Sequence, residues 1–116
     1  MEQPTIYHNP RCSKSRQTLA LLEQHGFAPL VVRYLDAPPS AEALERLLDA
    51  LDQPPLALVR RKEKEFADAG LSERSSSRAV AEAIQRWPIL MERPLVYFRG
   101  RAAIGRPPEK VLALFE

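Results

Sequence analysis

The residues best suited to chemistry surround a single sulfur atom. Cys12 is the only cysteine of the 116-residue chain, and it lies in the stretch YHNPRCSKSR, residues 7–16. A free thiol has a pKa of about 8.5, and its thiolate is the nucleophilic form. Nearby cations and the free backbone N–H groups of a helix N-terminus lower that pKa and also attract oxyanions. We therefore expect Cys12 to be an activated nucleophile that faces an anion.

An inert, buried cysteine is the alternative, because free cysteine is among the most buried residue types. The local composition favours the reactive interpretation, since four basic side chains lie within four residues of the sulfur: His8, Arg11, Lys14 and Arg16. One cysteine cannot close an internal disulfide or build a cysteine-rich metal site. Any redox chemistry must therefore use a thiol from another molecule.

Two predicted elements hold this stretch. The run PTIY, residues 4–7, predicts a short strand that ends at the turn signal HNP, and from Ser13 the sequence turns helical until Gly26. The run LVVRYL, residues 30–35, predicts a second, buried strand. The intervening helix favours a parallel β-α-β connection, which places Cys12 at a strand-to-helix junction.

Helices are predicted for the middle of the chain, and a second pair of strands follows them. Ser40 is a predicted cap for a leucine-rich helix, and residues 55–71 and 75–88 supply two more helical segments. Residues 93–105 predict a hairpin with Arg99-Gly100 in its turn. A terminal helix is predicted at the end of the chain, with proline in its first turn and one face formed by Val111, Leu112 and Phe115.

The predicted order is β-α-β, a helical insert at roughly residues 40–90, and then β-β-α. We expect one α/β domain over residues 1–116, with a mixed sheet. This is the element order of a thioredoxin-like (glutaredoxin-like) fold, and other small α/β domains share it.

Composition excludes several classes of protein. Apolar residues make up 45% of the chain and charged residues 28%, which is typical of a soluble globular protein. The net charge is only +2, and no basic run is long enough to indicate binding to nucleic acid or to a membrane. No apolar run approaches the roughly 18 residues of a membrane span, and the N-terminus lacks a signal-peptide pattern. We expect a cytoplasmic protein without nucleic-acid or membrane partners.

Motifs along the whole chain carry a family resemblance. YHNPRCSKSR resembles the H-N-P-x-C-x-x-S-R active-site motif of the ArsC family, the glutaredoxin-coupled arsenate reductases of the thioredoxin-like fold. YLDAPPS, ALVRRK, MERPLVY and IGRPPEKVL are similar to later segments of that family, in the same order. The chain ends just after its predicted final helix, and in this it resembles a shorter branch of the family.

The resemblance implies roles for particular residues. Cys12 would be the nucleophile, and His8 and Ser15 would support its thiolate. Three cations would hold the oxyanion: Arg60, Arg93 and Arg106. Arginine suits this role because its planar fork of donors stays protonated.

Two details of this clamp rest on the resemblance alone. Arg61 is adjacent to Arg60, and only the match to ALVR favours Arg60. The resemblance also implies a cis peptide bond before Pro94, although cis is the minority state of an X-Pro bond.

In the reaction that the resemblance implies, the Cys12 thiolate displaces water from arsenate. Glutathione as co-substrate and glutaredoxin then supply the remaining thiols, so that arsenite leaves. We expect no metal, no bound organic cofactor and a monomer. Two alternatives remain: a glutathione-dependent thiol-disulfide oxidoreductase, which needs no oxyanion clamp, and a non-catalytic redox-sensing regulator, whose relatives often use paired cysteines.

Overall fold

The computed structural model describes residues 2–116 and is built around a mixed sheet. Its four strands are β1 (Thr5–Tyr7), β2 (Leu30–Val32), β3 (Leu95–Phe98) and β4 (Arg101–Ile104), in the order β2-β1-β3-β4. Strand β2 runs parallel to β1, while β3 is antiparallel to both of its neighbours. The predicted α/β class and mixed sheet are confirmed, in the arrangement of a thioredoxin-like fold.

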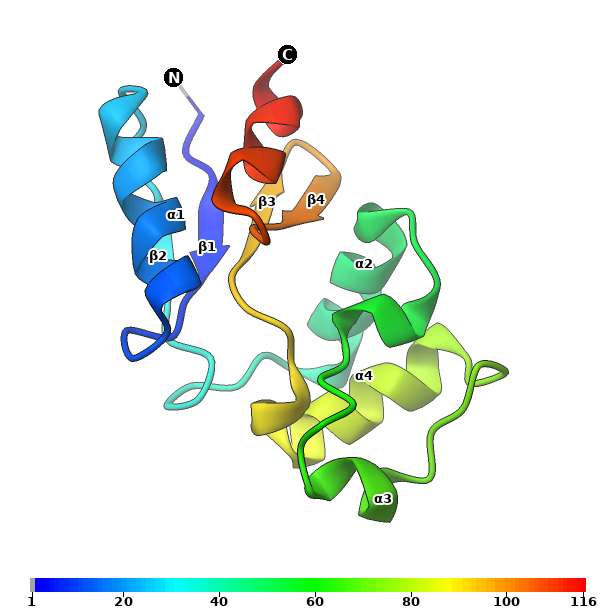
Figure 1. Cartoon of the computed structure of the whole chain (residues 1–116). Helices are drawn as coiled ribbons and strands as arrows, with labels where there is room; N and C mark the ends of the chain where they lie inside the picture. Colours follow the sequence, from blue (N-terminus) through cyan, green and yellow to red (C-terminus); the bar gives the residue numbers. More distant parts are fainter. Residues whose placement is uncertain (1) are drawn as a thin grey trace.

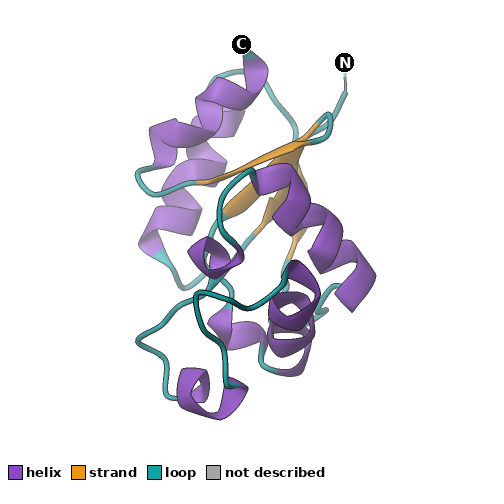
Figure 2. Ribbon diagram, turned by 90° about the vertical axis from the view of Figure 1, so that its right-hand side faces the viewer, coloured by secondary structure: helices purple, strands orange, loops and turns teal. Residues whose placement is uncertain are grey.

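One face of the sheet is covered by helix α1 (Ser13–Gln24) and the C-terminal 3₁₀ helix η3 (Pro108–Phe115). Figures 1 and 2 show helices on both faces of the sheet. The buried residues of the α1 and η3 side form one apolar cluster, which we call the sheet cluster: Ile6, Leu22, Val96, Phe98, Val111 and Leu114. This cluster fixes α1, and with it the residue at the helix N-terminus, against β1.

The segment between β2 and β3 is helical, as its sequence predicts. It contains α2 (Ala41–Leu51), α3 (Glu65–Ala69), α4 (Ser77–Arg86) and two short 3₁₀ turns, η1 (Pro55–Leu58) and η2 (Pro88–Leu90). The Ser40 hydroxyl accepts a hydrogen bond from the Ala43 N–H at 3.1 Å, so the predicted cap is confirmed.

Helices α2 and α4 pack on each other in a larger apolar cluster, which we call the insert cluster. This cluster also includes Leu95 of β3 and Ala102 of β4. The insert is therefore joined to the second face of the sheet by buried side chains.

The second strand differs from its prediction in length and in burial. Only Leu30–Val32 is extended, and β2 lies at the edge of the sheet, where Leu30 is 52% and Val31 41% exposed. A run of apolar residues looks alike in a central and in an edge strand, which explains the error. Beyond the strand the chain turns, and Tyr34 becomes completely buried in the insert cluster.

Residues 55–71 do not form one helical segment, because tertiary pairing interrupts it. Val59 forms an isolated bridge with Met91, and the Arg60 N–H donates to the Leu90 carbonyl at 2.7 Å. These bonds hold residues after η1 in an extended conformation despite a sequence that favours helix. The consequence is that Arg60 lies directly beside the segment that leads into β3.

The turn between β3 and β4 is as predicted, but the buried face of the C-terminal helix differs from its prediction. Arg99 and Gly100 have φ values of 50° and 80°, which is the left-handed geometry of the predicted hairpin turn. The terminal helix is a 3₁₀ helix with three residues per turn. Its buried face is therefore Pro108, Val111 and Leu114, whereas the predicted Leu112 and Phe115 are only half-buried.

Candidate active site

Cys12 occupies the N-cap position of α1, at the predicted junction of strand and helix. Its backbone is extended, with φ −95° and ψ 123°, and its carbonyl accepts the first helical hydrogen bond from the Arg16 N–H at 3.0 Å. Its own N–H donates to the Asn9 carbonyl at 3.0 Å, which closes the loop before the helix. The half-buried thiol therefore lies next to the unpaired N–H groups of the first turn.

A buried hydrogen-bond network braces this loop. The Ser15 hydroxyl is fully buried, accepts from the Asn9 N–H at 3.0 Å and lies 2.6 Å from His8 Nδ1. The Asn9 side-chain carbonyl in turn accepts from the Arg11 N–H at 3.0 Å. Within residues 2–116, the side chains of His8 and Ser15 form no hydrogen bond with the sulfur. They act on the loop that carries it.

The surroundings of His8 favour its neutral form. Burial lowers the pKa of His8, and the positive charges of Arg33 and Arg16 lower it further. A neutral imidazole can accept the Ser15 hydroxyl proton at Nδ1 while Ser15 Oγ accepts from the Asn9 N–H. These two hydrogen bonds therefore need no charge on the histidine.

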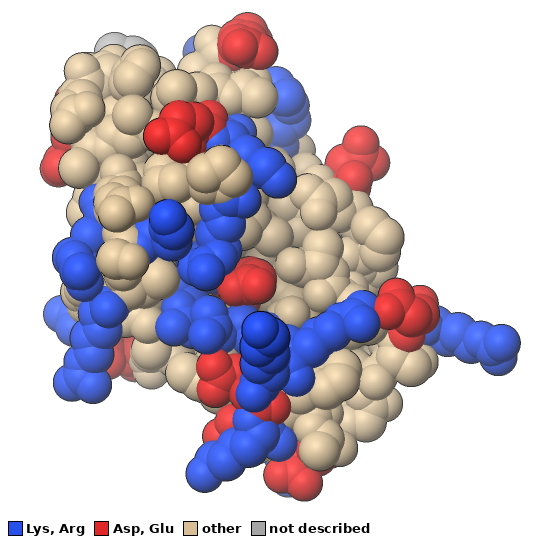
Figure 3. Space-filling view, viewed as in Figure 1, with Lys and Arg blue, Asp and Glu red and all other residues tan. Residues whose placement is uncertain are grey.

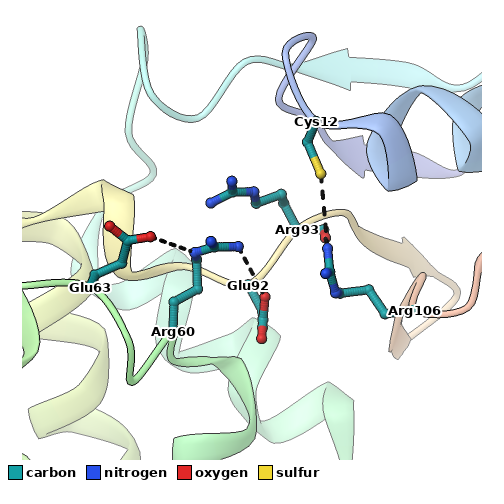
Figure 4. A network of polar contacts seen from close by, with 6 residues as sticks. All are labelled: Cys12, Arg60, Glu63, Glu92, Arg93 and Arg106. Carbon is teal, nitrogen blue, oxygen red and sulfur yellow. Dashed lines mark hydrogen bonds and ion pairs between the residues drawn. The ribbon is translucent and has the colours of Figure 1, made fainter.

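Two arginines flank the sulfur. Arg106 Nη1 lies 3.9 Å from Cys12 Sγ and also donates to the Arg93 carbonyl at 3.2 Å. Arg93 Nε and Nη1 are buried and have no hydrogen-bond partner among the described residues. Figure 4 shows the Arg106 side chain directed at the sulfur, with the Arg93 guanidinium to one side. Unpaired buried donors of this kind are rare and suit an anionic ligand.

Each of these arginines precedes a cis proline. The Arg93–Pro94 peptide bond is cis, as the family resemblance implied, and so is Arg106–Pro107, which was not expected.

Arg60 lies farther from the sulfur, in an ion-pair network (Figure 4). Its Nε donates to Glu63 Oε2 at 3.0 Å, and its Nη1 lies 3.5 Å from Glu92 Oε1. The neighbouring Arg61 is exposed and pairs with Glu73. The structure therefore directs Arg60, and not Arg61, toward the segment that carries Arg93.

The surroundings of Cys12 favour its thiolate. Burial alone would raise the pKa of Cys12, but donors outweigh it: the Ser15 backbone N–H, the Arg93 guanidinium and the Lys14 backbone N–H. The net effect lowers the pKa of Cys12 below its usual value. The predicted activation is therefore supported by the helix N-terminus and by one arginine in particular.

Sequence reasoning missed Tyr34. Its side chain is completely buried, and its hydroxyl has no hydrogen-bond partner among the described residues. The charges of Arg93, Arg60 and Cys12 all act on its pKa. Burial raises the pKa of Tyr34 to about 12, although the two arginines oppose the shift. The residue lies within the YLDAPPS motif, and its place in a predicted strand concealed its relation to the sulfur.

A cleft opens beside the Cys12 loop, lined in part by Pro10, Arg11, Arg33, Leu35 and Arg93. Figure 3 shows lysine and arginine side chains gathered around the N-terminal end of α1 and across the centre of this face. Basic side chains thus gather near the site, with some carboxylates among them, although the net charge of the chain is only +2. Residues 2–116 contain no cluster of three or more acidic, histidine or cysteine side chains able to hold a metal ion. Over the same range no helix combines the length and apolarity of a membrane span.

Known proteins resemble this chain over almost its whole length. The family model described as the ArsC family matches residues 7–114. The chain is 47% identical over 115 residues to the uncharacterized protein YfgD of Escherichia coli K12, covering 97% of each. It is 40% identical over 116 residues to an arsenate reductase of Neisseria meningitidis serogroup B, covering 98% of this chain and 99% of that one. The solved structure of an arsenate reductase from Vibrio cholerae matches with a TM-score of 0.89 and 46% identity over 97% of each chain.

Proposed function

Because this chain belongs to the ArsC family, we propose that it is an arsenate reductase with Cys12 as its nucleophile and Arg93 and Arg106 as its oxyanion clamp. The observation that carries the proposal is the pair of buried, unpartnered Arg93 nitrogens beside a thiol whose pKa is lowered. A disulfide substrate would leave those charged donors unpaired, whereas a tetrahedral oxyanion supplies several acceptor oxygens. The names of the relatives in Neisseria and Vibrio support the same substrate.

Binding would place the anion between the two arginines and the N-terminus of α1. Arg106 Nη1 is held near the sulfur by the Arg93 carbonyl, so the two side chains are positioned together. Arg60 is the outer member of the proposed clamp, and Glu63 and Glu92 reduce its effective charge. Preplaced donors of this kind stabilise charge that develops in a transition state without reorganising.

In the first chemical step, the Cys12 thiolate attacks the arsenic atom. A sulfur–arsenic bond forms, one arsenic–oxygen bond breaks, and the departing oxygen takes a proton and leaves as water. The arsenic remains in its oxidised state at this point. The lowered pKa of Cys12 increases the thiolate fraction available for this attack.

In the second step, we propose that the thiolate of glutathione attacks Cys12 Sγ. A disulfide bond forms, the sulfur–arsenic bond breaks, and its electron pair stays on arsenic, which leaves as arsenite. Glutaredoxin then attacks the mixed disulfide and returns Cys12 to the thiol form. The two-electron reduction oxidises two thiols to a disulfide, and because the chain has one cysteine, the second thiol comes from another molecule.

The proposed partners follow from this cycle. They are arsenate or a similar oxyanion, glutathione and glutaredoxin, with no resident metal or organic cofactor. We place the reaction in the cytoplasm, where the glutathione pool is reduced, and we take the enzyme to be a monomer.

The test is arsenate-dependent oxidation of NADPH in the presence of glutathione, glutaredoxin and glutathione reductase. We expect turnover by the native chain and none by a folded Cys12→Ser variant. A mixed disulfide offered to the same system in place of arsenate tests the thiol-disulfide alternative. Turnover of the disulfide with no response to arsenate would replace our proposal with that alternative, and equal rates for both proteins would remove Cys12 from the chemistry.

A further inference from the structure

The proposed cycle does not use the buried hydroxyl of Tyr34. The side chain is completely buried, and the hydroxyl has no hydrogen-bond partner among the described residues. A buried hydroxyl without a partner is unfavourable, because it has lost its hydrogen bonds to water. Such a group in a well-packed core calls for an explanation.

Two of the charged groups that act on the pKa of Tyr34 are arginines, which cannot accept its proton in a hydrogen bond. Arg93 and Arg60 lie near the phenol, and guanidinium groups carry only donors. Arg93 itself has two buried nitrogens with no partner. Arg93 can donate to the phenol oxygen, but neither arginine offers an acceptor for the phenol proton.

The charge of Cys12 also acts on the pKa of Tyr34, so this group of donors lies within electrostatic range of the nucleophile. An oxyanion bound for attack by the sulfur would bring acceptor oxygens to the donors that now lack them. Each oxygen of a tetrahedral oxyanion can accept more than one hydrogen bond. A single ligand can thus satisfy the phenol and the Arg93 nitrogens together.

We propose that the Tyr34 hydroxyl is a further substrate-binding donor, which hydrogen-bonds the oxyanion together with Arg93. This inference rests on the proposed function and adds a neutral donor to a clamp made of cations. A neutral donor adds a directed hydrogen bond without adding charge to the site. It favours a ligand with an oxygen at one position over any anion that merely carries the same charge. Because burial raises the pKa of Tyr34 to about 12, the phenol keeps its proton throughout the neutral range.

The experiment measures arsenate binding without turnover, in a Cys12→Ser background. Thermal unfolding is followed over a series of arsenate concentrations for this protein and for the same protein with Tyr34→Phe. Before arsenate is added, the Phe variant should unfold at the same temperature or higher, because it lacks the unpaired hydroxyl. Its dissociation constant for arsenate should rise by about tenfold to a hundredfold, as expected for a lost hydrogen bond to an anion.

Tyr97→Phe in the same background is the matched control. Tyr97 is a half-buried tyrosine that packs against the insert cluster, and we expect its variant to bind arsenate as the parent does. Arsenate binding by the parent and the Tyr34→Phe protein with equal affinity would overturn the inference and leave the proposed function intact. No arsenate-dependent shift in the parent would overturn both.

A second measurement separates contact with the anion from an effect through Arg93. The pH dependence of Cys12 alkylation is compared in the native chain and in a Tyr34→Phe single variant. We expect the same midpoint, because a neutral phenol contributes little to the thiolate. A higher midpoint in the variant would overturn the inference, since it would mean that Tyr34 acts by positioning Arg93 near the sulfur.

Discussion

At the scale of single residues, the reactivity of Cys12 depends on groups that take no part in bond making. The Ser15 and Lys14 N–H groups are backbone donors and survive any side-chain substitution, whereas the Arg93 contribution comes from a side chain. The two kinds of effect can therefore be separated by changing Arg93 alone. Changing Arg93 also tests whether one arginine both binds the oxyanion and stabilises the Cys12 thiolate.

We predict that the Cys12 alkylation midpoint lies below the roughly 8.5 of an ordinary thiol and rises in Arg93→Met. Methionine keeps the apolar stem and removes the charge that stabilises the thiolate. The rate of reaction with iodoacetamide is measured against pH. Arg61→Met is the matched control, because Arg61 is exposed and paired with Glu73, and its midpoint should not move. An unchanged midpoint in Arg93→Met would leave the backbone donors as the cause of activation.

Arg106 should be sensitive to a conservative change. Its Nη1 contacts both Cys12 Sγ and the Arg93 carbonyl, which leaves the other guanidinium donors for the oxyanion. A lysine ammonium is a point charge and lacks the planar fork that binds an oxyanion through two parallel hydrogen bonds. We predict that Arg106→Lys lowers kcat/KM for arsenate by about tenfold to a hundredfold, the value of one or two charge-assisted hydrogen bonds. Arg101→Lys, at an exposed arginine that donates to the Ala113 carbonyl, should retain native kinetics. Equal kinetics for the two variants would exclude Arg106 from the clamp.

At the scale of elements, the loop between β1 and α1 carries its own pH sensitivity. Because the pKa of His8 is lowered in the fold, the unfolded chain binds a proton at a higher pH than the folded chain does. The free energy of unfolding therefore falls as the pH drops below the unfolded value of about 6.5, until the folded His8 also becomes protonated.

We predict that His8→Asn reduces this loss of stability on acidification. Urea unfolding at pH 7 and pH 5 gives the difference for each protein. Exposed His25 is the control, and His25→Asn should show the same pH dependence as the native chain. A His8 variant that lost as much stability as the native chain would show that other groups titrate in this range.

The end of β4 reaches α1 only because residue 105 has no side chain. A Cβ at Gly105 would lie 2.6 Å from Thr18 Oγ1 and 2.8 Å from Pro94 Cγ. We predict that Gly105→Ala destabilises the protein by about 1–3 kcal/mol and also lowers activity, because Arg106 is the next residue. Adding Thr18→Ala should restore part of the loss in unfolding free energy. If the losses of unfolding free energy from Gly105→Ala and Thr18→Ala simply add, the new methyl group does not clash with Thr18.

Local signals in the sequence were sufficient for some elements. The Cys12 junction, the Ser40 cap and the Arg99-Gly100 turn depend on residues close in sequence, and each is found as expected. Features made by distant segments escaped the prediction. The exposure of β2 depends on strand order, and the extended backbone at Val59, just before Arg60, depends on the hydrogen bonds that Leu58 and Arg60 make with Glu92 and Leu90.

The same distinction applies to the candidate site. The family motif identified the residues that the structure brings to the sulfur, Arg93 and Arg106, but not the carboxylates that hold Arg60. Tyr34 escaped because its orientation is set by the chain turning after a short edge strand. No periodicity in the sequence reports such a turn.

At the scale of the whole molecule, two apolar clusters meet at one strand. Leu95 of β3 belongs to the insert cluster, and the adjacent Val96 belongs to the sheet cluster, because successive side chains of a strand point to opposite faces. The residues that anchor the two clusters are therefore neighbours in the chain. Separation of the insert from the sheet would disrupt both.

We predict that the insert and the sheet unfold in one transition. Trp87 is the only tryptophan and packs against the insert cluster, so its fluorescence reports the insert, while far-ultraviolet circular dichroism reports all elements. Urea unfolding curves from the two signals should coincide, which is a standard test of two-state behaviour. A fluorescence transition at lower urea would show that the insert unfolds by itself and would contradict a single domain.

The lone, half-buried sulfur at the start of α1 also determines how the oxidised protein can be recognised. A chain with paired cysteines can store two oxidising equivalents by losing two hydrogens, with almost no change in mass. In this chain a disulfide always includes a sulfur from another molecule, and direct oxidation of the thiol adds oxygen. Each of these oxidised states is therefore heavier than the reduced one, and intact-mass spectrometry of the unlabelled protein would give its redox state and identify what it last reacted with.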